Sequence, residues 1–174
     1  MAFDHDTYDE DYIRSILMGV KSIAVVGASE NPVRPSYFVV KYLIAKGYTV
    51  YPVNPGIAGK ELLGVKVYGS LKELPGAVDM VDIFRNSEAA LAITKEAVAI
   101  GAKVVWMQLT VRNDEAAALA EAAGLKVVMN RCPKIEYGRL SGEIGWAGVN
   151  SGTISNSRGR LAAVGTQNRV LGKQ

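Results

Sequence analysis

Three times along the chain, a helical stretch ends in a glycine that leads directly into a short apolar run. The three passages read KGYTV at residues 46–50, IGAKV at 100–104 and AGLKV at 123–127. A glycine just past a helix tolerates the left-handed conformation that ends many helices. The apolar runs themselves cover residues 23–26, 50–53, 80–84, 104–109 and 127–129. Short and nearly continuous apolar runs are typical of strands that are buried on both faces of a parallel sheet.

Helix signals lie between these runs. Helices are expected at residues 9–18, 36–46, 87–100 and 113–123. Pro35 suits the start of the second of these helices, Asn86 or Ser87 is the N-cap of the third, and the fourth opens with a cap followed by two acids. Five strands that alternate with helices predict a single α/β domain, built on a five-stranded parallel sheet with right-handed crossovers.

The remaining segments are less regular. Residues 60–75 form a link in which we expect a short extended piece at 65–68 and a short helix from Ser70. From Tyr137 onward the periodic pattern fades, which predicts a loop that packs on the domain. The expected organisation is an acidic arm and leading helix at residues 1–21, a main domain at residues 22–157 and a flexible basic tail at residues 158–174.

The 174 residues include one cysteine, Cys132, and one histidine, His5. A single cysteine excludes an intrachain disulfide and a multi-cysteine metal site. A single histidine excludes a histidine zinc cluster and argues against a Ser-His-Asp triad. His5 lies in an acidic arm that looks disordered, and we assign it no role. No apolar run approaches the ~20 residues of a membrane-spanning helix, and the acidic N-terminus is unlike a signal peptide, so we expect a cytoplasmic protein without membrane partners.

The charge of the chain is uneven. Residues 1–130 hold 13 basic and 15 acidic side chains, whereas residues 131–174 hold 7 and 2, so the two parts carry −2 and +5 of the net +3. A basic C-terminal segment is either a solvated tail or a contact for phosphate or nucleic acid. A nucleic-acid-binding regulator is disfavoured, because the segment lacks a helix-turn-helix signature and interleaved aromatic residues.

Polar and turn-forming residues follow all five expected strands, where open parallel sheets bind their ligands. The first of these loops reads GASENPVRPS, from Gly27 to Ser36. It runs from a strand into a helix, so the backbone N–H groups and the positive helix end favour an anion. Arg34 adds a guanidinium fork that is able to grip a phosphate. The alternative is an ordinary turn with a surface arginine.

The loop lacks the features of two common nucleotide sites. The dinucleotide fingerprint G-x-G-x-x-G is absent, and Asn54-Pro55 occupies the place of its companion acid at the end of the second strand. A P-loop motif is also absent. Binding of NAD and a P-loop NTPase activity are therefore both disfavoured.

Several strings resemble one family. SIAVVGASENPVRPSYFVVKYLIAKGYTVYPVNP, GKELLGVKVYGSLKELP, VDIFRNSE, NRCPKIE and GEIGWAGVNSGTIS are similar to the small stand-alone CoA-binding proteins, over roughly residues 13–157. That family resembles the CoA-binding domain of the succinyl-CoA synthetase α subunit. The resemblance implies a Rossmann-like doubly wound fold and binding of coenzyme A, or a short acyl-CoA, through its ADP half. It implies no known reaction, and the phosphohistidine of the synthetase has no counterpart here.

The position of the polar residues after the expected strands and the family resemblance together suggest a role for each candidate residue. Gly27, Ser29 and Ser36 are expected to cradle phosphate, with Arg34 on the pyrophosphate or the 3′-phosphate. The walls of the adenosine slot and the path of the pantetheine arm come from the later strand ends, with Ser87 also capping a helix. The full set is Gly27, Ala28, Ser29, Arg34, Pro35, Ser36, Val53, Asn54, Pro55, Lys60, Phe84, Arg85, Ser87, Gln108 and Cys132.

Other chemistry-bearing residues have structural alternatives. Cys132 is either a thiol that faces the thiol of CoA or a partly buried structural cysteine. Glu136 and Glu143 are either an acid/base pair or partners of Arg131 or Arg139 in salt bridges, which we favour. Trp106 and Trp146 are expected in the core, although Trp146 is also placed to cover a ligand.

The sequence thus favours a non-catalytic protein that binds CoA or acyl-CoA. The alternative is an NAD(P)- or CoA-dependent enzyme, either an oxidoreductase or an acyl or CoA transferase that acts through Cys132 or Glu136.

Overall fold

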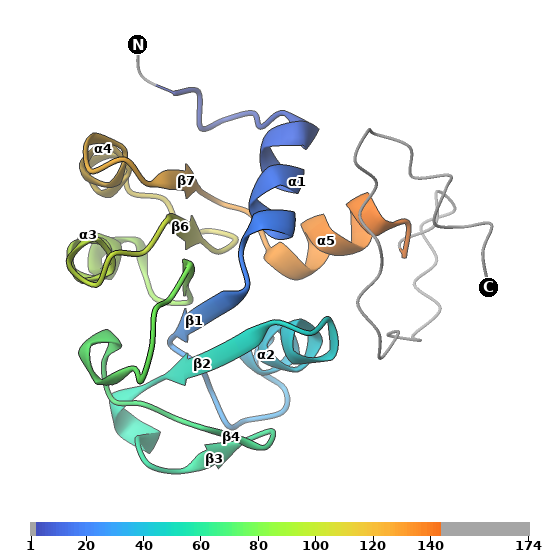
Figure 1. Ribbon diagram of the computed structural model, residues 1–174, viewed down its shortest axis with the longest axis vertical. Coiled ribbons are helices and arrows are strands. Elements are labelled where there is room, and N and C mark those ends of the chain that lie inside the picture. Colours follow the sequence, from blue (N-terminus) through green and yellow to red (C-terminus); the bar gives the residue numbers. More distant parts are fainter. Residues whose placement is uncertain (1–2, 144–174) are drawn as a thin grey trace.

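A five-stranded parallel sheet forms the centre of the protein in a computed structural model, which describes residues 3–143 (Figure 1). Its strands are β1 (Ser22–Val26), β2 (Thr49–Val53), β5 (Met80–Ile83), β6 (Val104–Met107) and β7 (Lys126–Val128), in the spatial order β2-β1-β5-β6-β7. The order reverses between β1 and β5, which is the arrangement of a doubly wound sheet. The predicted fold class is therefore confirmed. Trp146 and the expected tail at 158–174 lie outside the described residues.

Residues 3–143 contain five α-helices, which are α1 (Glu10–Gly19), α2 (Pro35–Ala45), α3 (Ser87–Ala99), α4 (Asp114–Ala122) and α5 (Pro133–Ser141). Of these, α2, α3 and α4 connect strands of the sheet, whereas α1 precedes β1 and α5 follows β7. The Asp9, Asn86 and Asn113 side chains cap α1, α3 and α4 by accepting hydrogen bonds from backbone N–H groups in the first turn. The expectation that Ser87 caps a helix is wrong, because Asn86 holds that position.

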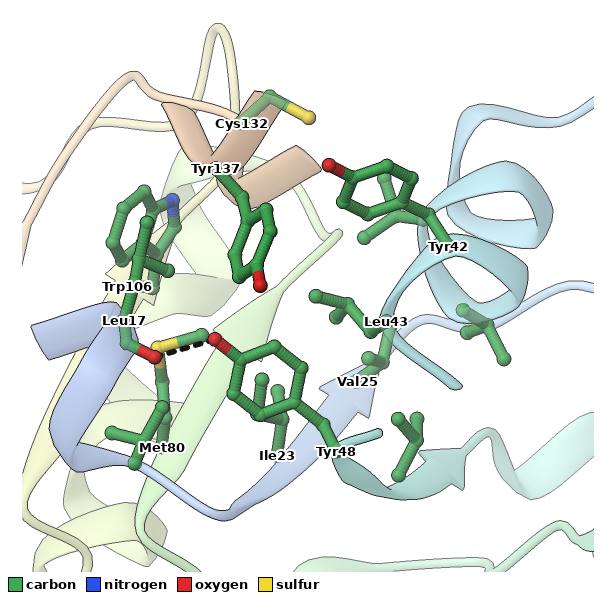
Figure 2. Close-up of a cluster of buried hydrophobic side chains, with 14 of the residues drawn as sticks. Leu17, Ile23, Val25, Tyr42, Leu43, Tyr48, Met80, Trp106, Cys132 and Tyr137 are labelled. Carbon is green, nitrogen blue, oxygen red and sulfur yellow. Dashed lines mark hydrogen bonds between the residues drawn. The ribbon is translucent and has the colours of Figure 1, made fainter. Parts of the chain in front are cut away.

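The helices cover both faces of the sheet. Helices α1, α2 and α5 pack on one face, and α3 and α4 pack on the other (Figure 1). Figure 2 shows the first of these two cores, where Ile23, Val25 and Trp106 of the sheet meet Leu43 of α2 and Tyr137 of α5. Trp106 is fully buried and its Nε1 donates to the Arg131 carbonyl at 2.8 Å, so its expected place in the core is confirmed.

The irregular link contains a small antiparallel hairpin of β3 (Glu61–Leu62) and β4 (Val65–Lys66). Leu63 and Gly64 both have positive φ, at 52° and 82°, as a two-residue hairpin turn requires. Two short 3-10 helices flank the hairpin, η1 (Pro55–Ile57) and η2 (Leu71–Glu73). The extended piece near residue 65 and the helix after Ser70 were expected, and the partner strand β3 was not.

Helix α5 contradicts the loop that we expected from Tyr137 onward. Pro133 begins the helix, and Gly142 ends it in the left-handed conformation, with φ of 78°. Its inward side contains Tyr137 and Leu140, together with small and polar residues. This short apolar stripe does not produce a readable helical period in the sequence.

The acidic arm is also more structured than its composition indicates. The Tyr8 hydroxyl accepts from the Met129 N–H at 2.8 Å. The His5 Nε2 lies 3.0 Å from a carboxylate oxygen of Glu121 of α4, and its Nδ1 lies 2.9 Å from the Tyr8 hydroxyl. The arm is thereby attached along β7 and α4.

Candidate cofactor-binding site

Gly27 lies directly after β1, at the point where the strand order reverses. Its φ is +92°, and a Cβ added there would lie 2.5 Å from the Phe84 carbonyl oxygen beyond β5. The Gly27 N–H donates to the Val53 carbonyl of β2 at 2.9 Å. The chain therefore passes between the ends of β2 and β5 only because residue 27 has no side chain.

A pocket of about 370 Å³, here called the loop pocket, opens above this glycine and lies at the carboxyl ends of the strands. Its lining consists of Gly27, Ala28, Ser29, Arg34, Pro35, Ser36, Asn54, Phe84 and Arg85, all of which are residues that the sequence had singled out. The structure therefore brings nine of the candidates into one pocket.

The loop pocket has the composition of an anion site. Helix α2 begins at its rim with Pro35 after Arg34, and no side chain caps the first turn. The free N–H groups of a first helical turn and the positive helix end attract anions. Arg34 and Arg85 are exposed, and neither forms an ion pair with another residue in the 3–143 range. Two guanidinium groups are thus available to a ligand.

Asn54 fixes the end of β2, where the sequence predicts a wall of the adenosine slot. Its Nδ2 donates to the Ala28 carbonyl at 2.8 Å, and its Oδ1 accepts from the Gly56 N–H at 2.8 Å. Both ends of the amide are therefore used to hold the end of β2 against the first loop.

A second, larger pocket of about 620 Å³, here called the apolar pocket, adjoins the first one. Gln108 and Cys132 line it, and Pro35, Phe84 and Arg85 line both pockets. Sequence reasoning missed most of its wall, which includes Val33, Phe38, Val39, Leu109, Thr110, Val111, Lys134 and Ile135. Lys134 and Ile135 belong to the helix α5 that the sequence did not reveal. Phe38 could have been identified as a candidate, because it is a large apolar residue on the exposed side of α2.

Three buried side chains make a polar cluster, and two of them, Gln108 and Cys132, line the apolar pocket. Asp82 of β5 is fully buried, and the Gln108 Nε2 lies 3.3 Å from each of its carboxyl oxygens. Burial raises the pKa of Asp82 well above its usual value, although the hydrogen bond from Gln108 acts in the opposite direction. Burial also raises the pKa of the Cys132 thiol, which disfavours the thiolate.

Four predicted site residues line neither pocket. Val53 is buried beneath the first loop. Pro55 begins η1. Lys60 is exposed and forms an ion pair with Glu30 at 3.1 Å. The Ser87 hydroxyl accepts from the Arg112 N–H at 3.0 Å. Their expected contacts with a ligand remain predictions.

The two glutamates have separate partners. Glu136 accepts from Arg139 at 2.9 Å, which confirms the predicted salt bridge. Glu143 pairs instead with Lys46 and accepts from the Tyr42 hydroxyl at 2.7 Å, so its expected arginine partner is wrong.

No group of three or more His, Cys, Asp or Glu side chains is arranged to hold a metal ion within residues 3–143. No helix in that same range is long and apolar enough to cross a membrane.

Two known proteins are similar to this chain over most of their own length. The Bacillus subtilis protein YneT is 41% identical over 125 residues, which cover 72% of this chain and 91% of YneT. The solved structure of a hypothetical protein from Pyrococcus horikoshii OT3 is 41% identical, with a TM-score of 0.74, and the match covers 80% of this chain and 97% of that one.

A more distant relative is a subunit of an enzyme. The alpha subunit of the ADP-forming acetate–CoA ligase II of Pyrococcus furiosus is 47% identical over 64 residues, which are 36% of this chain but only 14% of that subunit. A family model described as a CoA binding domain matches residues 21–138, a span that contains both pockets. The chain therefore belongs to the CoA-binding domain family.

Proposed function

We propose that the protein binds coenzyme A through its ADP and pyrophosphate half, and that it does so without catalysing a reaction. The observation that carries this proposal is the loop pocket, where the start of α2 and two arginines without ion-pair partners in residues 3–143 surround Gly27. CoA carries three phosphates, so it needs such a concentration of donors. The predicted cytoplasmic location is part of this proposal.

The residues of the loop pocket fit that half of the cofactor. The absence of a Cβ at Gly27 keeps the pocket floor open, because a side chain there would collide with Phe84. Ser29 and Ser36 line the pocket beside Arg34, and they supply hydroxyl and backbone donors to phosphate oxygens. Asn54, with both amide ends occupied, provides no carboxylate for the 2′-hydroxyl of an NAD ribose.

The candidate nucleophiles support binding over group transfer. A transferase that uses Cys132 needs a thiolate, and burial raises the pKa of this thiol. Glu136 is buried on α5 and is engaged by Arg139 at 2.9 Å. Turnover of acyl-CoA that is lost in Cys132→Ser or Glu136→Gln would contradict the non-catalytic part of the proposal.

Calorimetric titration of ligand-free protein tests the binding mode. We expect CoA to bind more tightly than 3′-dephospho-CoA, ADP to retain part of the affinity, and pantetheine and NADH to bind weakly. Each missing phosphate removes charge-assisted hydrogen bonds, which contribute about 1.5–3 kcal/mol each. No heat with CoA at millimolar concentration, or equal affinity for NADH and CoA, would refute the proposal.

The variant Arg34→Ala tests the loop pocket directly. We expect CoA affinity to fall by about 1.5–3 kcal/mol, because one charge-assisted phosphate contact is lost. Stability should barely change, since Arg34 is exposed and without an ion-pair partner among residues 3–143. Lys41→Ala is the matched control, because it removes a positive charge from an exposed position on the same helix. Wild-type affinity in Arg34→Ala would show that this arginine does not contact the cofactor.

A further inference from the structure

We infer that the apolar pocket receives the acyl group of an acyl-CoA, so that the preferred ligand is a thioester with an uncharged aliphatic acyl chain rather than free CoA. This inference rests on the proposed function, because CoA must first be anchored in the loop pocket. It adds the chemical class of the acyl group, which nothing in the loop pocket determines.

The two pockets are continuous with each other. Pro35, Phe84 and Arg85 line both of them, so one surface leads from the phosphate-binding end into the apolar end. A cofactor held by its phosphates has a flexible arm that ends in a thiol, and this surface is a path along which the arm is able to extend. The apolar pocket has about 620 Å³, which lies in the range of small-molecule sites.

Exposed apolar side chains are concentrated around the apolar pocket. Six large hydrophobic residues are exposed within residues 3–143, and four of them line this pocket, namely Val33, Phe38, Leu109 and Ile135. They come from the first loop, from α2, from the loop after β6 and from α5. Single exposed apolar residues are ordinary, but a convergence of four from separate elements marks a binding surface. Phe38 and Leu109 are each 48% exposed, so an apolar ligand gains by covering them.

The buried part of the pocket lining includes polar side chains but carries no exposed charge. Gln108 is 5% exposed and Cys132 is 7% exposed, and Asp82 lies fully buried behind Gln108. A neutral amide and a thiol offer hydrogen bonds to an uncharged group such as a thioester carbonyl. Two cations also belong to the lining, namely Arg85 on the wall shared with the loop pocket and Lys134, whose Nζ lies over the Tyr42 ring at 5.8 Å. Away from the shared wall, the buried part of the lining thus suits an uncharged chain better than a carboxylate.

A series of acyl-CoA ligands tests the inference on the full-length protein. Calorimetry with CoA, acetyl-CoA, butyryl-CoA and hexanoyl-CoA should show affinity that rises roughly fourfold for each added methylene until the pocket is filled. Succinyl-CoA, whose chain has the length of butyryl but ends in a carboxylate, should bind more weakly than butyryl-CoA. Equal affinity for CoA and all its thioesters, or a preference for succinyl-CoA, would overturn the inference and leave the proposed function intact. Binding of none of these ligands would refute the proposed function itself.

Two variants assign the effect to the pocket. Phe38→Ser and Leu109→Ser should each reduce the ratio of butyryl-CoA to CoA affinity at least threefold. Met18→Ser is the matched control, because Met18 is 47% exposed on α1 and lies outside the pocket. Thermal unfolding of each variant without ligand shows whether it is folded, and two variants on different elements keep the test decisive. If Phe38→Ser instead abolishes a dimer seen by sedimentation and leaves the ligand ratio unchanged, the apolar wall is a subunit interface and the inference is wrong.

Discussion

Gly27 occupies a position where a side chain has no room. Its positive φ and the 2.5 Å approach of an added Cβ to the Phe84 oxygen are two separate obstacles to substitution. We expect Gly27→Ala to lower the free energy of unfolding by about 2–5 kcal/mol, from backbone strain and overpacking together. Because the first loop must shift, CoA affinity should fall at least tenfold, as measured by calorimetry beside chemical denaturation.

A second glycine separates the two obstacles. Gly124 has a similar φ of +86°, but nothing lies within 4 Å of an added Cβ. Gly124→Ala should therefore lower the free energy of unfolding only by the cost of a left-handed backbone, about 1–2 kcal/mol. Its CoA affinity should be that of the wild type. Equal losses of stability and affinity in both variants would show that the close approach to Phe84 has no consequence.

Asp82 makes stability depend on pH. Burial raises its pKa well above the usual 3.8, so the native state holds a proton that the unfolded chain releases as pH rises past that value. At this residue the native state then binds more protons than the unfolded state, so the contribution of Asp82 to stability falls with rising pH, by at most about 1.4 kcal/mol per pH unit for one proton. Asp82→Asn removes this titration. Denaturation at pH 4 to 7 should show the variant gaining stability relative to wild type as pH rises, and a constant difference would contradict the raised pKa.

At the scale of elements, the strands were predictable because their apolar runs are short, continuous and bounded by turn residues. Helix α5 was not predictable, since its inward side offers only Tyr137 and Leu140 as large apolar residues. The order of the acidic arm was not predictable for a related reason. Its acidic composition indicates a solvated segment, whereas the bonds that attach it come from the hydroxyls of Tyr8 and Tyr12 and depend on a strand more than 100 positions later in the chain.

The residues of the candidate site also fall into a part that was predictable from the sequence and a part that was not. Residues of the loop pocket follow strands directly, so the rule that ligands bind at the carboxyl ends of parallel strands was enough to gather them. The apolar pocket needs α5 and the exposed side of α2, and neither is visible before the elements are packed together. The sequence therefore predicted the residues of the loop pocket, which suits an anion, and did not predict most of the apolar pocket.

Tyr12 of α1 covers the outer edge of β7. The Tyr12 hydroxyl donates to the Val127 carbonyl at 3.0 Å and accepts from the Val127 N–H at 3.1 Å. Edge strands leave such groups unpaired unless something covers them. Tyr12→Phe should lower the free energy of unfolding by about 1–3 kcal/mol in urea denaturation, because both backbone groups lose their partner.

A matched control exists on the opposite edge of the sheet. Tyr51 of β2 is half-buried, and its hydroxyl makes no hydrogen bond to another residue of the described chain. Tyr51→Phe should therefore change stability by less than about 0.5 kcal/mol. A similar loss in both variants would mean that the ring environment, and not the pairing with β7, determines the effect of the hydroxyl.

At the scale of the whole molecule, the site links the two halves of the sheet. The loop pocket takes residues from beyond β1, β2 and β5, and the apolar pocket adds residues from beyond β6 and β7. A ligand that spans both pockets contacts the ends of all five strands, so it stabilises the folded chain as a unit. This coupling makes global stability a measure of binding.

Thermal unfolding in the presence of CoA tests that coupling. A ligand that binds only the native state adds about 2.7 kcal/mol at one hundred times its dissociation constant, and for a chain of 174 residues this should raise Tm by about 5–10 °C. Arg34→Ala should show the same rise, displaced to higher CoA concentration by the factor that calorimetry gives for its loss of affinity. If the wild-type Tm stays constant while calorimetry detects binding, CoA binds the unfolded chain as well as the native one. If Arg34→Ala and wild type shift at the same concentration, Arg34 lies outside the site.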